Sequence, residues 1–326
     1  MNWIEWGKTI AGGAICTPEQ ALAVLQSADD ELLEVMQAAF EVRRRYFGRG
    51  VVLQVLRNAK SGQCSEDCAF CSQSAHSTAP IVRYPLQAVD DIVQGAREAR
   101  TLGALRYCVV LSGRSPADAT LDAICEAAQR IKREAPIQLC TSLGLITRAQ
   151  AERLKAVGVD RFNHNLETSA RFFPSICQTH THADRVATAT AVKQAGLELC
   201  CGGLFGMGET LEDRVDLALA LRTVGADSIP LNFLDPRPGT RLEGRERIRP
   251  MEALRVLAMV RLVNPDREIR AAGGREACLG PLQALALYAA NSLFTNGYLT
   301  TDGQGHAADL KLIESAGFYV AGLTVG

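Results

Sequence analysis

The sequence lacks the features of a membrane protein and of a nucleic-acid-binding protein. It contains no run of about 20 apolar residues, which a membrane-spanning helix requires. Lysine and arginine number 35 against 36 aspartates and glutamates, so the net charge of −1 provides no attraction to a phosphate backbone or an anionic membrane. The first residues also lack the charged start and apolar core of a secretory signal. We therefore expect a cytoplasmic protein without a nucleic-acid or membrane partner.

Cysteine, by contrast, is abundant, with 11 residues in a chain of 326. A chain without an export signal keeps its thiols reduced, and an odd number of cysteines argues against a purely disulfide-bonded framework. The thiols are therefore expected to serve metal binding or catalysis. The sequence shows no internal repeat, low-complexity tract or clear linker.

Three of the cysteines, Cys64, Cys68 and Cys71, form a C-x3-C-x2-C triplet. A cubane iron–sulfur cluster normally has four thiolate ligands, so three on one loop leave one iron open to a small molecule. An open coordination position also distinguishes catalytic metal sites from structural ones. The apolar run 51–56 before the triplet is typical of a buried parallel strand. The triplet should thus lie on a loop at the carboxyl end of an early strand, where α/β folds place their chemistry.

Three other interpretations of the triplet are possible. A zinc site requires four ligands, and His76 is a candidate for the fourth. A disulfide would leave one thiol over. A closed iron–sulfur cluster would need a fourth cysteine from elsewhere in the chain, which this sequence could supply. The spacing favours the open cluster.

Strand and helix patterns alternate after residue 50, which predicts a parallel sheet and, with eight strands, a closed TIM-type (β/α)8 barrel. The predicted strands are 51–56, 105–111, 136–142, 159–165, 196–202, 226–232, 267–272 and 289–294. The predicted helices between and after them are 87–103, 118–134, 147–157, 184–195, 210–224, 250–263 and 306–317. The seventh and eighth strands are the weakest of these because they are rich in alanine and glycine.

The ends of the chain are expected to pack on the outside of the barrel. Residues 17–46 have helical spacing, begin with Thr17 and Pro18 as a cap and first-turn proline, and precede the first strand. We therefore predict an N-terminal helical extension over residues 1–47, the barrel over 48–302, and a C-terminal helix and tail over 303–326.

A second set of cysteines lies within predicted strands. Cys108, Cys140 and Cys200 belong to the second, third and fifth strands, and inward-pointing side chains from these strands can meet in the barrel centre. Three converging thiols would form a second, deeper metal site. Alternatively, they are buried free cysteines that behave as small hydrophobes. Only one of Cys200 and Cys201 can enter the barrel, because adjacent strand residues face opposite ways, and the sequence alone leaves open which one does.

Polar residues at strand ends are further candidates for ligand contacts. Asn163 and Asn165 end the fourth strand, and Asn232 ends the sixth. We expect His164, between the two asparagines, to be a hydrogen-bonded structural residue. The glycine-rich segment 202–209 would let the backbone approach a ligand, although glycine also serves tight turns. It lacks the Gly-Lys-Ser/Thr ending of a phosphate-binding loop.

Together these motifs resemble the biotin synthase family of the radical S-adenosylmethionine (AdoMet) superfamily. The similarity spans about residues 50 to 302 and is carried by six segments. These are Gly62–Ser74, Asn163–Ser169, Gly203–Thr210, Pro230–Leu234, Ile269–Glu276 and Tyr288–Phe294. The triplet alone would specify only the superfamily, whereas the set of motifs specifies the family.

The resemblance implies two iron–sulfur clusters. A [4Fe–4S] cluster would be bound by Cys64, Cys68 and Cys71, with AdoMet on the open iron. A [2Fe–2S] cluster would be bound by a second set of ligands, which are Cys108, Cys140, Cys200 and Arg270. Guanidinium is normally a permanent cation without a free lone pair, so chemistry alone makes Arg270 a counter-ion, and only the resemblance makes it a ligand.

The resemblance also implies how small molecules bind. Asn165 and Glu167 would contact AdoMet, Asn165 and Asn232 would hold dethiobiotin, and the residues beside the adenosyl group would be Phe70, Gly203 and Gly206. Glu167 stands where aspartate is usual, Ser65 where proline is frequent and Phe70 where tyrosine is frequent. Cys201 and Cys278 are additional thiols near the expected site.

The activity implied is insertion of sulfur into dethiobiotin to give biotin. The family also implies a homodimer and an external electron donor of the flavodoxin or ferredoxin type. Two alternatives remain at this point: another radical AdoMet barrel enzyme, such as one similar to a hydrogenase maturase, which would need only the first triplet, and a non-catalytic iron–sulfur redox protein.

Overall fold

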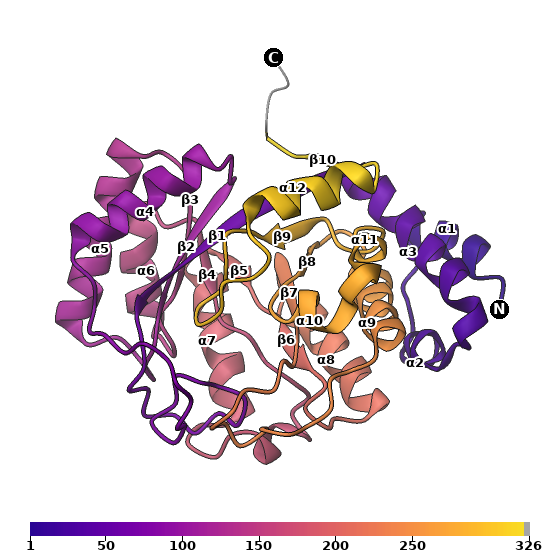
Figure 1. Ribbon diagram of the computed structural model, residues 1–326, viewed down its shortest axis with the longest axis horizontal. Helices are drawn as coiled ribbons and strands as arrows, with labels where there is room; N and C mark the ends of the chain where they lie inside the picture. Colours follow the sequence, from indigo (N-terminus) through magenta and orange to yellow (C-terminus); the bar gives the residue numbers. More distant parts are fainter. Residues whose placement is uncertain (323–326) are drawn as a thin grey trace.

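The computed structural model describes residues 1–322 and contains a closed parallel β-barrel (Figure 1). Its strands follow the order β1-β2-β3-β4-β5-β7-β8-β9, and pairing of β1 with β9 closes the ring. The barrel strands are β1 (Gly50–Lys60), β2 (Arg106–Leu111), β3 (Gln138–Ser142), β4 (Arg161–Asn163), β5 (Glu198–Cys200), β7 (Ser228–Phe233), β8 (Glu268–Ala271) and β9 (Ser292–Phe294). All eight predicted strands are therefore confirmed, and so is the TIM-type fold.

Helices alternate with the strands and surround the barrel (Figure 1). They are α4 (Val89–Thr101), α5 (Asp118–Glu134), α6 (Arg148–Ala156), α7 (His182–Gln194), α8 (Leu211–Thr223) and α9 (Pro250–Val263). Between β8 and β9 lie only the short helices α10 (Arg275–Leu279), η3 (Gly280–Leu282) and α11 (Gln283–Ala286), and a single turn, η2 (Phe173–Ser175), follows β4. The predicted helices from 87–103 to 250–263 are confirmed to within a few residues at each end.

The two faces of each strand have different surroundings, as β2 illustrates. Tyr107, Val109 and Leu111 belong to the main apolar core, and the Tyr107 hydroxyl donates a hydrogen bond to the backbone of α4. The alternate residues Cys108 and Val110 line the cavity inside the barrel instead. Because side chains alternate along a strand, one face of β2 packs in the apolar core and the other faces the cavity.

The N-terminal extension is helical, as predicted, but it is divided into separate helices. Residues 17–46 form two helices, α2 (Pro18–Gln26) and α3 (Leu32–Phe47), separated by the 3-10 turn η1 (Asp29–Glu31). The break occurs because Ser27 and Ala28 are extended, with ψ of 146° and 161°. An additional helix, α1 (Trp3–Ala11), precedes them, and Asn2 caps it. Residues 17–46 are therefore helical as predicted, and the break between α2 and α3 is a feature that the sequence analysis did not anticipate.

Two further departures concern strands. The predicted fifth strand, 196–202, is shorter, and a separate strand, β6 (Gly203–Phe205), pairs with β7. The chain ends with α12 (His306–Ser315) and β10 (Tyr319–Val320), and β10 pairs with the start of β1. The predicted 306–317 helix is confirmed, the end of the 303–326 tail lies outside the described residues, and the domain boundaries stay a prediction. Within residues 1–322, no helix has the length and apolarity needed to cross a bilayer.

Candidate functional site

The barrel encloses a cavity of about 380 Å³ that opens toward the carboxyl ends of the strands. Nine of the predicted site residues line it, and seven of these are Cys71, Cys108, Cys140, Cys200, Asn165, Asn232 and Arg270. Phe70 and Glu167, which the resemblance assigned to AdoMet binding, line it as well. Residues from widely separated parts of the chain therefore share one chamber.

The cysteine triplet lies on the loop that follows β1, as predicted. The loop folds back on itself: the Cys64 amide donates to Gln73, the Ala75 amide donates to the Cys64 carbonyl over 2.7 Å, and the Cys71 amide donates to the Cys68 carbonyl over 3.1 Å. All eleven cysteines of the chain are free thiols. Burial raises the pKa of the Cys71 thiol to about 11, so this thiol stays protonated until a metal replaces the proton. A tight loop carrying three thiols fits a cubane cluster.

A second loop, residues 176–181 after η2, holds the triplet loop in place. The Glu66 carboxylate accepts hydrogen bonds from Thr179 and from His180, the latter over 2.5 Å. The Asp67 carboxylate accepts from the backbone amides of Gln178 and Thr179, and the Ala69 amide donates to the Ile176 carbonyl over 2.8 Å. The charged residues Glu66 and Asp67, which lie between Cys64 and Cys68, therefore anchor the triplet loop to the second loop.

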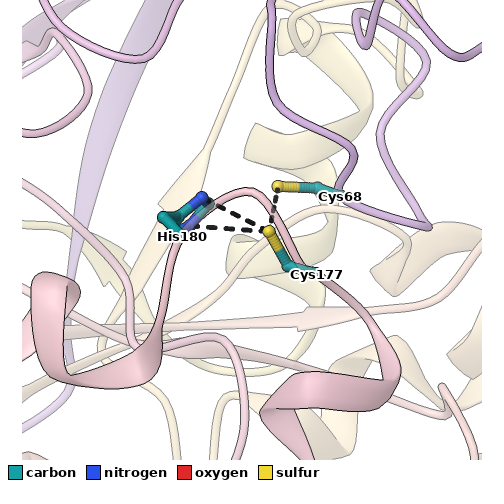
Figure 2. Close-up of side chains that lie close together, drawn as sticks. All are labelled: Cys68, Cys177 and His180. Atoms are coloured by element: carbon teal, nitrogen blue, oxygen red, sulfur yellow. Dashed lines mark hydrogen bonds between the residues drawn. The ribbon is translucent and has the colours of Figure 1, made fainter.

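The same loop places a fourth thiol beside the triplet (Figure 2). The Cys68 thiol donates to Cys177, with the two sulfurs 3.9 Å apart, and the Cys177 sulfur lies 3.3 Å from His180 Nδ1. This contact lowers the pKa of the Cys177 thiol to about 4 and raises that of Cys68, because the pair shares one proton. The sequence analysis missed Cys177 and His180; the only signal was a Cys-x2-His spacing in the loop after the fourth strand.

The second set of cysteines lies deeper in the cavity. Cys108 and Cys140 are opposite each other in the register of β2 and β3, and Cys200 ends β5. A hydrogen bond to Cys140 and burial raise the pKa of the Cys108 thiol. Cys200 lines the cavity, whereas Cys201 belongs to the main apolar core and is fully buried there. The structure therefore resolves the choice between Cys200 and Cys201 in favour of Cys200 as the inward residue.

Arg270 from β8 lies among these thiols. Its Nη1 is 3.6 Å from the Cys200 sulfur, and its Nη2 donates to Glu268 over 2.6 Å. The guanidinium also stacks on Phe294, 4.6 Å from the ring centroid. Burial favours the neutral form, but the electrostatic influence of the Cys200 sulfur and the Glu268 carboxylate outweighs it and raises the pKa of Arg270. A cation held among three thiols fits an anionic cluster.

Glu268 is a site residue that the sequence analysis did not identify. Its carboxylate binds Arg106 and Arg161 in addition to Arg270, at 3.2 Å and 3.0 Å. Burial opposes the charge on Glu268, but the three guanidinium groups outweigh it and lower the pKa of the carboxyl. The signal that could have revealed this network is a charged residue at the start of three buried strands, β2, β4 and β8.

Asn165 and Glu167 lie just beyond the end of β4. The Asn165 amide oxygen accepts from the Gly202 backbone, and its amide nitrogen donates to Glu167 over 3.5 Å. Glu167 has a φ of +69° and lies 3.5 Å from Arg185, while burial raises the pKa of its carboxyl. A non-glycine residue held with positive φ beside a cavity is typical of functional sites.

The remaining predicted residues, Asn232, Gly203 and Gly206, make contacts that support the fold around the cavity. Asn232 lines the cavity, but its amide also donates to the Gly203 carbonyl and accepts from the Gly273 backbone. A side chain on Gly203 would come within 2.6 Å of the Glu167 carbonyl, so glycine is required for close backbone packing there. Gly206, with φ of +94°, lies in the turn that Glu209 caps, outside the cavity lining.

Two expectations about neighbouring residues are corrected. His164 is buried as predicted, but its Nε2 has no hydrogen-bond partner among the described residues, and burial lowers its pKa well below the usual value. Cys278 is buried near the Leu234 carbonyl and, like Cys201, is outside the cavity lining.

His76 and Cys68 are not part of one group of potential metal ligands in the described chain, whereas Cys68, Cys177 and His180 are.

The parallel barrel with a cysteine loop at its carboxyl end is that of a radical AdoMet enzyme, and residues 59–221 match the Radical SAM superfamily. Residues 230–319 match the Biotin and Thiamin Synthesis associated domain. The chain is 50% identical to the biotin synthase of Salinibacter ruber over 97% of its own length and 88% of that protein, and 47% identical to the biotin synthase of Lysinibacillus sphaericus over 98% and 97%. It belongs to the biotin synthase family.

Solved structures with low sequence identity share the fold. The crystal structure of methylornithine synthase has a TM-score of 0.85 at 22% identity and covers 97% of both chains. The hydrogenase maturase HydG of Carboxydothermus hydrogenoformans has a TM-score of 0.83 at 18% identity, over 98% of this chain and 79% of that one. These similarities establish the fold, and the reaction has to be inferred from the residues of the cavity.

Proposed function

We propose that this chain catalyses the insertion of sulfur into dethiobiotin to form biotin. The observation that supports this most strongly is that one cavity is lined both by Cys71 of the triplet and by the three cysteines of the second set. Cys71 lies where the cavity opens, and Cys108, Cys140 and Cys200 lie deeper in it. A radical AdoMet enzyme without sulfur insertion would need only the first set.

In this proposal Cys64, Cys68 and Cys71 hold a [4Fe–4S] cluster whose fourth iron binds AdoMet. A second, [2Fe–2S] cluster would be held by the deeper set, which is Cys108, Cys140, Cys200 and Arg270. When bound, the first cluster and AdoMet supply a carbon-centred radical, and the second cluster supplies sulfur. Thiolates are the ligands that iron–sulfur clusters prefer, and the six cysteines of the two sets are free thiols.

Polar residues between the two sets would bind the small molecules. Asn165 and Glu167 project from the end of β4 and are proposed to contact AdoMet, together with Phe70, Gly203 and Gly206. Asn165 and Asn232 would orient dethiobiotin between AdoMet and the deeper thiols. Both asparagines line the cavity, which supports this assignment.

The cavity walls would keep water from the reacting groups. Leu56, Val110, Leu204 and Phe233 line the cavity with apolar surface. An apolar lining excludes solvent, so a reactive radical meets its substrate rather than a side reaction. The contribution of the protein is therefore orientation and exclusion of water, while the cofactors carry the difficult chemistry.

We further propose a homodimer, a flavodoxin- or ferredoxin-type electron donor, and a cytoplasmic location. The eleven free thiols support a reducing compartment. The dimer and the donor are supported by the biotin synthase family to which the chain belongs.

The test is an anaerobic assay of the reconstituted protein with dethiobiotin, AdoMet and a reductant. The proposal predicts biotin and 5′-deoxyadenosine as products. Formation of 5′-deoxyadenosine with no biotin from any preparation that holds both clusters would indicate a different radical AdoMet reaction. Absence of AdoMet cleavage with intact clusters would refute the enzyme assignment altogether.

The variant Cys140→Ala separates the two cysteine sets. It should retain AdoMet cleavage, because the first cluster is untouched, and it should abolish biotin formation, because the sulfur source loses a ligand. Mass spectrometry of both products in one reaction measures the two effects together. Cys125→Ala, which removes a thiol on the outer helix α5, is the matched control and should change neither product.

A further inference from the structure

Cys177 is a buried thiol that the proposed reaction does not use. It lies on the loop after η2, and its side chain faces Cys68 and His180 (Figure 2). Cys177 is 2% exposed and His180 is 6% exposed, whereas Cys68 is partly exposed. One possible ligand atom from each of the three residues lies within 4.8 Å of the other two.

The distances within this group match those around a single tetrahedral ion. With zinc–sulfur bonds of about 2.3 Å and zinc–nitrogen bonds of about 2.0 Å, two sulfurs on one ion are about 3.8 Å apart and a sulfur and a nitrogen about 3.5 Å. The Cys68 and Cys177 sulfurs are 3.9 Å apart, and the Cys177 sulfur is 3.3 Å and 3.8 Å from the two His180 nitrogens. The side chains therefore need little movement to share one ion.

The hydrogen bonds of His180 suit a metal ligand. Arg185 Nε donates to His180 Nε2 over 2.9 Å, so Nε2 carries the lone pair and Nδ1 donates to Glu66. A carboxylate that accepts the other ring N–H is the usual partner of a zinc-bound histidine. A metal ion at Nε2 would replace one positively charged partner, Arg185, by another.

The backbone around the group is already ordered by contacts that do not involve the metal. Asp67 accepts from two amides of the second loop, and Arg241 Nη2 donates to the carbonyls of Asp67 and Ile176. These bonds join the two loops on either side of Cys68 and Cys177. Because the loops are held together in advance, binding would not have to order them.

We propose that, before the cluster is installed, Cys68, Cys177 and His180 bind one thiophilic divalent cation of the zinc class, with water in the fourth position. Binding displaces the proton that the two thiols share and involves no redox change. Since Cys68 is also a proposed ligand of the [4Fe–4S] cluster, the ion and the cluster exclude each other. This last consequence depends on the proposed function, whereas binding of the ion does not.

The test uses cluster-free, reduced, full-length protein under anaerobic conditions. The background variant C64S/C71S disables the cluster triplet but keeps Cys68, and zinc is titrated against a chromogenic chelator. Adding Cys177→Ser should remove one equivalent of tight zinc, weakening that site about 100-fold or more, because ligand loss exceeds the 10–100-fold effect of losing a supporting residue. Cys125→Ser, a cysteine on the outer helix α5, should leave all equivalents in place.

Two results would overturn the proposal. The first is unchanged zinc stoichiometry and affinity after Cys177→Ser in the same background, with the fold checked by circular dichroism. The second is a Co²⁺ derivative whose sulfur-to-metal absorption is insensitive to both Cys177→Ser and His180→Ala. Two variants are used so that a local folding defect in one does not decide the outcome.

Competition with the cluster is measured separately. Zinc added before iron and sulfide should suppress assembly of the [4Fe–4S] cluster in the wild-type chain and suppress it much less in Cys177→Ser. Equal suppression in the two proteins would show that zinc acts through the triplet instead. Neither result depends on biotin formation, so a failure of the proposed activity remains distinguishable.

Discussion

At the scale of single residues, the barrel interior is organised around charge. Arg270 is 1% exposed, and its hydrogen bonds to Ser228, Ser292 and Glu268 fix its plane beside Cys200. Guanidinium remains charged under all ordinary conditions, so this cation requires a buried counter-charge. Glu268 supplies it when the thiols are protonated, and thiolates would add to it when a metal is bound.

Glu268→Gln should destabilise the protein strongly. The substitution keeps the size of the side chain but removes the negative charge shared by Arg106, Arg161 and Arg270. Uncompensated buried cations should lower the free energy of unfolding by about 3 kcal/mol or more. Urea unfolding of the cluster-free protein, followed by circular dichroism, measures the change.

Glu198→Gln is the matched control for this prediction. Glu198 also pairs with Arg161, at 2.6 Å, but its side chain is 52% exposed. Because water screens an exposed pair, the loss should not exceed about 1 kcal/mol. Equal losses in the two variants would contradict the view that burial gives Glu268 its importance.

At the scale of elements, the start of α8 connects the glycine-rich strand exit to the helix layer. Thr210 and Asp213 form a capping box, in which each side chain accepts a hydrogen bond from the other's backbone amide. Asp213 also accepts from Ser169 and Arg171, so it ties α8 to the segment after β4. One carboxylate thus fixes the positions of two segments that border the site.

Asp213→Asn should cost stability in a pH-dependent way. Burial opposes the charged form, but hydrogen bonds from Ser169, Thr210 and Arg171 outweigh it and lower the pKa of Asp213 to about 2. Because the folded pKa lies below the unfolded value of about 3.9, the stabilisation is complete above pH 4 and is lost as the pH falls toward 2. Because folding lowers the pKa from about 3.9 to about 2, urea unfolding should show a deficit of roughly 2 to 3 kcal/mol at pH 7. The deficit should shrink as the pH is lowered below 4; a gap that is constant with pH would contradict this account.

The regular elements were predictable because their signals are local. β-branched apolar runs identify β1 and β2, and helical spacing identifies α5 and α6. The break at Ser27 and Ala28 was not predicted because the helical spacing resumes after it. Helix α1 was missed although Asn2 provides its cap, since a nine-residue helix depends on tertiary packing more than on its own signal.

The site was predictable where its residues share a motif or a strand position. The triplet and the thiols of β2, β3 and β5 were identified in this way, but the strand pattern left Cys200 and Cys201 undecided until the fold placed Cys201 in the apolar core. Cys177 and Glu268 were missed because their roles depend on partners more than 100 residues away, such as Cys68 at a separation of 109. Such contacts are set by barrel closure, which no local pattern records.

At the scale of the whole molecule, the barrel keeps two metal-binding sets apart in depth. The triplet is on a loop beyond β1, whereas Cys108 and Cys140 are within β2 and β3, below the strand ends. The outer set depends on the contacts between two loops, and the inner set on the register of the sheet. Because the supports differ, loading of one set should not require the other.

Iron and sulfide content after anaerobic reconstitution tests this independence. The wild-type chain should bind about six irons, four in the outer cluster and two in the inner one, with the spectroscopic signatures of both. Cys64→Ala should leave about two irons and only the [2Fe–2S] signature, since the inner thiols remain in the sheet. Cys108→Ala combined with Cys140→Ala should leave about four irons and only the [4Fe–4S] signature. Loss of both signatures in either variant, with the fold intact by circular dichroism, would mean that the two sets form one cooperative site. The separation in depth would then have no functional consequence.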